Sequence, residues 1–372
     1  MPNNSECQIR IYDPDFNWVA ETHQAESVQF TRELYGVGSF EIHIHPDKSG
    51  AMELIKPKNI IVINHDGHKS GIVREFTIEE SRGKSEFVIY GDTGSGKTRQ
   101  MITVPPTQKQ DANALGWDKI NAAAETVIKH YAGMNMVTSY DRGRIHPHVT
   151  MTPDQARGTV IPWKSRYAKL DEELYNICSY ADIGYEIYAD TANKRWLFDV
   201  ITGTDRSKSQ DAVSPVSFTM EYQNLDSYRY VEDYQNYKNV GYTGGSGEDE
   251  NRLVYTIGAN ITGDDRWETF LDCGNAANID ELIYYGNQKM NEYKEAKTVE
   301  VSALPRAFIF DKDYFLGDIV TIIISRIGLR LDTRITAVKE IWERPSGYKA
   351  EARFGDKVPN IFTILNKSKE VR

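Results

Sequence analysis

The sequence predicts an α+β fold that is mostly antiparallel β, with two similar small β-barrel-like domains and two smaller α+β domains. Three observations predict it. Short segments with alternating apolar and polar residues fill the first hundred positions, which is typical of antiparallel strands with one solvated face. Three later segments have apolar residues at helical spacing. One strand–strand–turn–strand pattern occurs twice, about 260 positions apart.

The repeated pattern covers residues 57–92 and 316–356. The second strand of each copy contains a shared Val, and the third strand ends in Gly-Asp. These markers are Val73 and Gly91 in the first copy and Val338 and Gly355 in the second. From marker to marker the copies differ by one residue, which a turn can absorb. Because a solenoid needs tandem units, two distant copies predict two related β-domains in one chain.

Changes in composition predict four domains. Pro105-Pro106 and the polar run after it mark the first boundary. We expect a first β-barrel-like domain at 1–106, an α+β domain at 107–212, a second β-barrel-like domain at 213–245 and 299–356, and an inserted helix-containing α+β domain at 246–298 and 357–372.

Apolar spacing predicts three helices and one hairpin in the α+β segments. The first helix contains Ile120, Ala124, Val127, Ile128 and Tyr131 and ends at Gly133; the second begins at Ser165, contains Leu170, Leu174, Ile177, Cys178 and Ala181 and ends at Gly184; the third covers 279–296. Strands at 185–188 and 195–200 predict the hairpin.

Composition excludes several functional classes. A net charge of −10 over 372 residues argues against a general nucleic-acid binder, because phosphate neutralisation needs a basic stripe. Three distant cysteines form no disulfide or zinc pattern, so we expect synthesis in a reducing cytoplasm. No basic start with an apolar core and no apolar run of about 20 residues is present, so neither a signal peptide nor a membrane span is expected.

Residues 91–98 match the phosphate-loop pattern at every fixed position, which Gly91, Gly96, Lys97 and Thr98 occupy. In such loops backbone amides surround a phosphate, Lys neutralises it and Thr binds magnesium. The context does not fit, because Pro105-Pro106 leaves no room for the long helix that must follow. We therefore interpret the match as a coincidence and keep a nucleotide-binding protein as the alternative hypothesis.

Other candidate sites are weaker. Pairs of histidines occur at His43 and His45, His65 and His68, and His146 and His148. No Cys or carboxylate spacing completes a metal site with any of them, so we expect no metal and no cofactor. Neither a nucleophile elbow nor a zinc-protease motif is present, and no catalytic residue is nominated. A carbohydrate-binding β-protein with Tyr- and Trp-rich strands is a third hypothesis.

The chain resembles the tail-associated hub proteins of siphophage tail tips, which are related to the central hub of contractile tails. The resemblance lies in segments 9–13, 38–42, 70–73, 90–91, 216–218, 237–240, 313–321, 334–340 and 354–356. Each segment is weakly specific, but together they cover nearly the whole chain in order. Family members often have Leu-Leu-x-x-Arg after the first repeat, where this chain has 93–97. That departure created the phosphate-loop match.

The resemblance implies a structural protein without enzyme activity, located at the virion tail tip and made in the bacterial host cytoplasm. It implies a homotrimer whose two β-domains per subunit form a pseudo-sixfold ring on the distal tail ring protein. The tape-measure protein and tail fibre or receptor-binding components are the other expected partners. DNA is expected only in transit, with no sequence-specific binding. The sequence ends soon after the second repeat, so no attached wall-degrading domain is expected.

Overall fold

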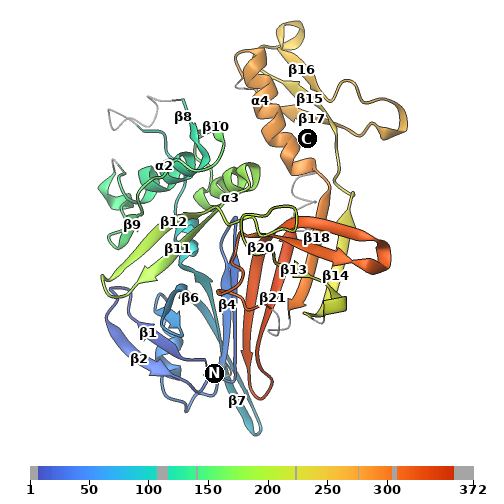
Figure 1. Cartoon of the computed structure of the whole chain (residues 1–372). Helices are drawn as coiled ribbons and strands as arrows, with labels where there is room; N and C mark the ends of the chain where they lie inside the picture. Colours follow the sequence, from blue (N-terminus) through green and yellow to red (C-terminus); the bar gives the residue numbers. More distant parts are fainter. Residues whose placement is uncertain are drawn as a thin grey trace. The chain divides into compact units, whose positions relative to one another are not determined.

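The computed structural model describes residues 7–106, 116–139, 141–222, 224–274, 276–303 and 308–355. The chain divides into two compact units, which are the described residues of Met1–Tyr228 with Glu300–Phe354, and of Arg229–Val299 with Gly355–Arg372 (Figure 1). We call them unit 1 and unit 2. In sequence, unit 2 is an insertion, because the chain leaves unit 1 within β14 (Leu225–Asp233) and returns to it within β18 (Ala296–Ala303).

Most strands belong to one 13-stranded sheet with the order β14-β18-β21-β20-β3-β4-β7-β6-β5-β1-β2, in which β19 also pairs with β20, and β13 with β19. Besides β14 and β18, its strands are β1 (Ile9–Tyr12), β2 (Trp18–Thr22), β3 (Ser27–Glu33), β4 (Ser39–Ile44), β5 (Ile60–Ile63), β6 (Asp66–Ser81), β7 (Lys84–Thr93), β13 (Ser217–Phe218), β19 (Ile319–Ile324), β20 (Leu329–Glu343) and β21 (Gly347–Gly355). The short helix α1 (Ala51–Leu54) lies between β4 and β5 in sequence. Alternating burial in β3 and β4 reflects their alternating sequence. The predicted α+β class with mostly antiparallel strands is confirmed.

The sheet contains one strand order twice. The first repeat has the order β3-β4-β7-β6-β5, and the second has the order β14-β18-β21-β20-β19. In the first repeat, β3 and β4 are followed in sequence by the meander β5-β6-β7, and β7 pairs with β4. In the second repeat, β14 and β18 are followed by the meander β19-β20-β21, and β21 pairs with β18. The sequence pattern therefore marks two copies of the same five-stranded arrangement.

Each repeat contains one β-bulge in its longest strand pair, and superposing the two bulges aligns the repeats. In the first, the register between β6 and β7 shifts between Val73 and Glu75. In the second, the register between β20 and β21 shifts between Ile335 and Ala337. The bulges therefore match Val73 with Ile335, and Gly91 with Phe354. The expected match of Val73 with Val338 and of Gly91 with Gly355 is therefore wrong, because identical residue types at these positions do not follow the strand register.

An α+β layer follows the first repeat in unit 1. It consists of β8 (Asp118–Ala123), α2 (Ala124–Met136), β9 (Val149–Met151), β10 (Val160–Ser165), α3 (Leu170–Ala181), β11 (Gly184–Asp190) and β12 (Arg195–Ile201). The strands form a β10-β8 pair and a β11-β12-β9 sheet. Buried residues of α2 and α3 pack with those of β11 and β12 in one core, which also includes Ile60, Val62 and Ile72 of the first repeat.

The helices of this layer differ from the sequence expectation at their ends. Ile120 lies in β8, and Gly133 lies inside α2, which continues to Met136. Ser165 ends β10, and Gly184 begins β11. The C-cap of α3 is Asp182, which adopts the left-handed conformation with φ 54°, because a short polar side chain tolerates it better than most residues. Helical spacing located the helices, but the tertiary pairing of β8 and β10 set where they begin.

Unit 2 has its own three-stranded sheet. The sheet has the order β16-β15-β17, made of β15 (Val240–Gly244), β16 (Val254–Ile257) and β17 (Glu268–Asp272), and α4 (Ile279–Met290) packs on β15 and β16. The strand β15 belongs to this sheet, although it lies within the segment 213–245 that we expected in the second β-barrel-like domain. The predicted helix over 279–296 ends at Met290, and 357–372 lie outside the described residues. In the part of the chain that the structure describes, no helix has the length and apolarity needed to cross a membrane.

Candidate functional site

The two repeats join edge to edge inside unit 1. Strand β3 of the first repeat pairs antiparallel with β20 of the second, from Ala337 opposite Glu33 to Glu343 opposite Ser27. We call residues 337–343 the outer half of β20. Trp342 from this half packs in the core of the first repeat and is buried. The joint is thus an ordinary antiparallel ladder that is closed by a shared core.

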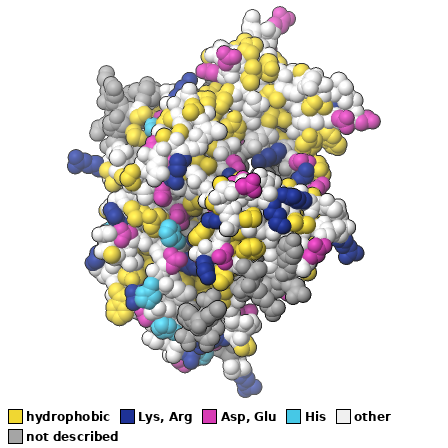
Figure 2. Space-filling model, in the orientation of Figure 1, with side chains coloured by type: hydrophobic (Ala, Val, Ile, Leu, Met, Phe, Trp, Pro, Cys, Tyr) yellow, Lys and Arg dark blue, Asp and Glu magenta, His cyan; other side chains and the backbone are white. Residues whose placement is uncertain are grey.

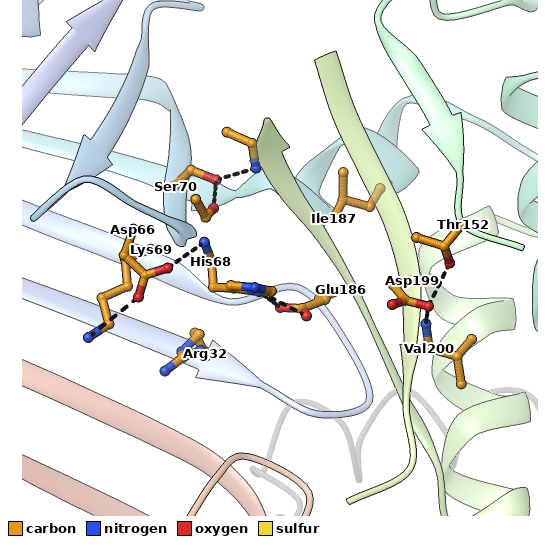
Figure 3. Close-up of polar contacts among 12 residues, drawn as sticks. Arg32, Asp66, His68, Lys69, Ser70, Thr152, Glu186, Ile187, Asp199 and Val200 are labelled. Atoms are coloured by element: carbon orange, nitrogen blue, oxygen red, sulfur yellow. Dashed lines mark hydrogen bonds and ion pairs between the residues drawn. The ribbon is translucent and has the colours of Figure 1, made fainter. Parts of the chain in front are cut away.

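An ionic cluster lies at this joint, made of the buried Glu340 and the partly buried Arg32, Lys69 and Asp311. The Lys69 ammonium lies 2.7 Å from Glu340 Oε1 and 3.1 Å from Asp311 Oδ2. Arg32 donates to both Asp311 oxygens at 2.6 and 2.7 Å. The Tyr348 hydroxyl donates to Glu340 at 3.0 Å. Two cations and two carboxylates therefore balance within one site, and Figure 3 shows Arg32 and Lys69 side by side.

Burial and charge pairing act against each other in this cluster. Burial raises the pKa of Glu340, and Lys69 and Arg32 oppose that rise. Burial would raise the pKa of Asp311 as well, but Arg32 and Lys69 lower it overall. Burial raises the pKa of the adjacent Cys7 thiol to about 12, so this cysteine is unreactive. The ion pairs of this cluster connect residues of three strands, β3, β6 and β20.

Polar contacts also attach the α+β layer to the start of β6. Figure 3 shows His68 pointing toward Glu186 of β11, with Nδ1 3.0 Å from the carboxylate. The Ser70 hydroxyl accepts from the Ala189 amide at 3.1 Å. A Cβ on Gly67 would lie 2.1 Å from the Ala189 carbonyl oxygen, so only glycine permits this close approach. The first repeat and the α+β layer are therefore fitted to each other at backbone level.

The phosphate-loop match lies in this same contact. β7 ends at Thr93, and η1 (Gly94–Gln100) is a short 3-10 helix. Thr98 is fully buried and its hydroxyl donates to the Ser95 carbonyl at 2.7 Å. Lys97 Nζ lies 5.5 Å from the Trp196 ring centroid, and burial lowers its pKa to about 8. The residues at the fixed positions of the phosphate-loop pattern lie close together because they are neighbours in sequence. The atoms that surround them belong to other parts of the same chain.

Packing accounts for the glycines of this loop. A Cβ on Gly94 would lie 2.1 Å from the Ile187 carbonyl oxygen, and one on Gly91 would lie 2.2 Å from Phe40. A Cβ on Gly96 would lie 2.4 Å from the Cβ of Asp92. Each glycine is required by a neighbour within the chain. That the match is a coincidence remains a prediction.

The histidine pairs are dispersed among separate contacts. His43 lies 2.6 Å from Glu41 and 3.0 Å from Glu86, and His65 contacts Gln8. His148 lies 3.3 Å from Asp15. Among the residues that the structure describes, no group of three or more His, Cys, Asp or Glu is arranged to hold a metal ion.

Sequence reasoning missed the ionic cluster. Its members are separated by up to 308 positions, from Arg32 to Glu340, so no local spacing could indicate it. One signal was present: Glu340 lies at strand spacing between the apolar residues Val338 and Trp342, on the same face of β20. A charged residue at such a position is almost never buried unless it is paired.

Comparison with known families decides the identity of the chain. The sequence profile of the Siphovirus ReqiPepy6 Gp37-like protein family matches residues 8–356. The chain belongs to this family. The predicted resemblance to siphophage tail proteins is thereby confirmed. Among curated proteins, none matches the sequence.

Solved structures share the fold of this family member. The tail protein from Neisseria meningitidis MC58 has 13% sequence identity and a TM-score of 0.58, with 94% of this chain and 97% of that chain covered. The 43 kDa tail protein of prophage MuSo2 from Shewanella oneidensis has 10% identity and a TM-score of 0.57, with 93% and 98% covered. Prophage tail protein gp18 from Listeria monocytogenes has 10% identity and a TM-score of 0.54, with 98% and 99% covered. The chain therefore has the fold of phage tail proteins along nearly its whole length.

Proposed function

We propose that this protein is the structural hub of a phage or prophage-derived tail tip. Three subunits form a ring that matches the sixfold symmetry of the tail to a threefold tip and surrounds the DNA exit channel. The observation that supports this most directly is the repeated strand order in unit 1, because two equivalent arrangements per subunit give six in a trimer. The tail-protein fold of its structural relatives supports the same assignment.

The partners follow from that position in the tail. One face of the ring binds the distal tail ring protein, the tape-measure protein ends at the hub, and fibre or receptor-binding components attach below. The net charge of −10 suits a channel through which DNA passes without adhering. On the face shown in Figure 2, acidic and basic side chains are intermixed. Replacing acidic channel residues by lysine is expected to slow DNA ejection.

The hub acts without catalysis and is located at the virion tail tip after synthesis in the bacterial host cytoplasm. The ionic cluster at the joint between the repeats supports a structural role, because its charged groups are paired with one another. The rival hypothesis, a nucleotide-binding protein, is tested by titrating the chain with labelled ATP and magnesium. We expect no saturable binding. Saturable binding that is lost in Lys97→Ala would favour the rival.

Light scattering after size exclusion tests the hub proposal in solution. We expect a mass three times that of the chain, alone or with the distal tail ring protein. Imaging of intact particles that carry a label on this protein should place the label at the tail tip. A monomer under all conditions, or a label along the tail tube, would contradict the proposal.

A further inference from the structure

One strand edge of the first repeat differs from its counterpart in the second. The bulge aligns residues 75–81 of β6, which we call the outer half of β6, with the outer half of β20. The two halves have the same length and precede turns of two and three residues. In the second repeat this edge is covered by β3. In the first repeat, no described strand other than β7 pairs with residues 75–81.

Burial follows this difference in pairing. Val338, Glu340 and Trp342 of the covered edge are each at most 5% exposed. Their counterparts by the bulge alignment are Phe76, Ile78 and Glu80. Phe76 is 38% exposed and Ile78 is 53% exposed, although their cross-strand neighbours Ile89 and Phe87 are buried. Two apolar side chains on an unpaired strand edge indicate a surface that another strand covers.

The duplication indicates which strand that is. The covering strand β3 is the first strand of the first repeat, and β14 is the first strand of the second. β14 is also the terminal strand of the sheet. Within one chain β14 cannot reach β6 as a neighbour, because six strands lie between them in the sheet order.

We propose that the outer half of β6 in one subunit pairs with β14 of the next subunit, in the way that β20 pairs with β3 inside each subunit. This inference rests on the proposed trimer and assigns its contact surface. The contact is head to tail, because two different edges meet, and such contacts form closed rings when the rotation allows. Six equivalent ladders then surround the threefold axis, three within subunits and three between them.

The charges on the two edges predict how salt acts on this contact. Residues 75–81 contain Glu75, Glu79 and Glu80, and β14 contains Asp226, Glu232 and Asp233 against Arg229. Pairing brings the carboxylates of β6 close to those of β14, and like charges opposite each other are unfavourable across a ladder. Since salt screens exposed charges, we expect the association to strengthen as the salt concentration rises. The same repulsion guards the free edges against non-specific strand pairing.

The test uses the full chain with Phe76→Lys and Ile78→Lys combined. Both side chains are exposed in the single subunit, so the variant is expected to stay folded with a cooperative unfolding transition, while the trimer mass is lost in light scattering. The matched control is Trp18→Lys with Val19→Lys on β2, the edge strand at the end of the sheet opposite β14, where two exposed apolar residues also lie. The control is expected to remain trimeric.

Proline substitutions test the other edge. Asp226→Pro and Ser227→Pro remove amide donors that point to opposite edges of β14. The variant with the higher unfolding midpoint of the two has lost the outward donor and kept the bonds to β18, and we expect it to be monomeric. Mixed with the β6 variant, it should form a one-to-one dimer, because one intact ladder remains between them.

The outcomes separate the two proposals. A wild-type chain that stays monomeric at all salt concentrations, both alone and with the distal tail ring protein, overturns the trimer and the ladder together. A wild-type trimer that persists in the Phe76→Lys/Ile78→Lys variant overturns the ladder alone. A homodimer of the β14 variant by itself would show that β6 pairs with its own copy and would also overturn the ladder.

Discussion

The two repeats of this chain have the same strand order and the same bulge but opposite surroundings. The outer half of β20 is covered by β3, and five of its seven residues are buried. The outer half of β6 is exposed at every residue. Equal topology therefore does not produce equal environments. The neighbour that each edge meets determines which residue types occupy it.

Single positions show how the repeats have diverged. Where the first repeat has Glu80, the second has Trp342, whose side chain packs in the core of the first repeat. Where the first repeat has Ile78, the second has Glu340, which is neutralised by Lys69 from the first repeat. We expect a buried charge with a partner across the joint to favour this strand pairing over alternative pairings.

The largest expected effect comes from truncating the aromatic residue at the joint. Trp342→Ala removes a nearly buried indole and leaves a cavity, so we expect a loss of about 3–5 kcal/mol in the free energy of unfolding. The equivalent change in the first repeat, Glu80→Ala, is on an exposed strand and should stay within about 0.5 kcal/mol. Urea denaturation of both variants measures the contrast. Equal losses would show that the bulge alignment does not describe the environments of the repeats.

The second prediction concerns the ionic cluster. Lys69→Met keeps the aliphatic stem but leaves Glu340 and Asp311 with one cation between them. Removing one partner of a buried ion pair costs about 3–5 kcal/mol, and the low end of that range is expected because Arg32 remains. The control Lys349→Met removes a half-exposed partner of Glu351 on β21, where at most about 1 kcal/mol is at stake. A Lys69→Met variant as stable as this control would show that the cluster does not hold the joint.

The sequence was sufficient for the repeat but not for the joint. Alternating residues in strands such as β4 and the match between residues 57–92 and 316–356 indicated two β-domains, because strand period and turn chemistry are local. The alignment erred at Val73 because a bulge changes register without changing composition. The pairing of β3 with β20 and the Lys69–Glu340 contact depend on segments 271 positions or more apart, so no local signal could specify them.

The third prediction concerns the loop that leaves the first repeat. There, η1 packs so closely on β11 that Gly94→Ala would place a methyl group against the Ile187 carbonyl. We expect a loss of about 1–3 kcal/mol from this overpacking. Gly116→Ala is the control, because a Cβ there meets open space. A Gly94→Ala variant with unchanged stability would mean that the glycine is not required by packing, and would reopen the phosphate-binding hypothesis.

The smallest expected effect concerns His68 at the start of β6, where the two repeats have different contacts. His68 contacts Glu186 in the α+β layer, whereas its counterpart on β20, Arg330, is exposed. The hydrogen bond with Glu186 raises the pKa of His68 above its ordinary value. A raised folded-state pKa stabilises the fold at pH values below the unfolded pKa of about 6.5, and that stabilisation is lost as the pH rises through the folded value.

The difference in unfolding midpoint between wild type and His68→Gln should therefore be largest in mildly acidic solution and shrink toward alkaline pH. It should be modest, because the His68 side chain is nearly half exposed and solvent weakens its ion pair. In a Glu186→Gln background the same substitution should have no such pH dependence, since the carboxylate that favours the protonated ring is gone. A difference that is constant with pH would show that His68 attaches the α+β layer by packing alone. The contact would then be independent of charge, unlike the joint between the repeats.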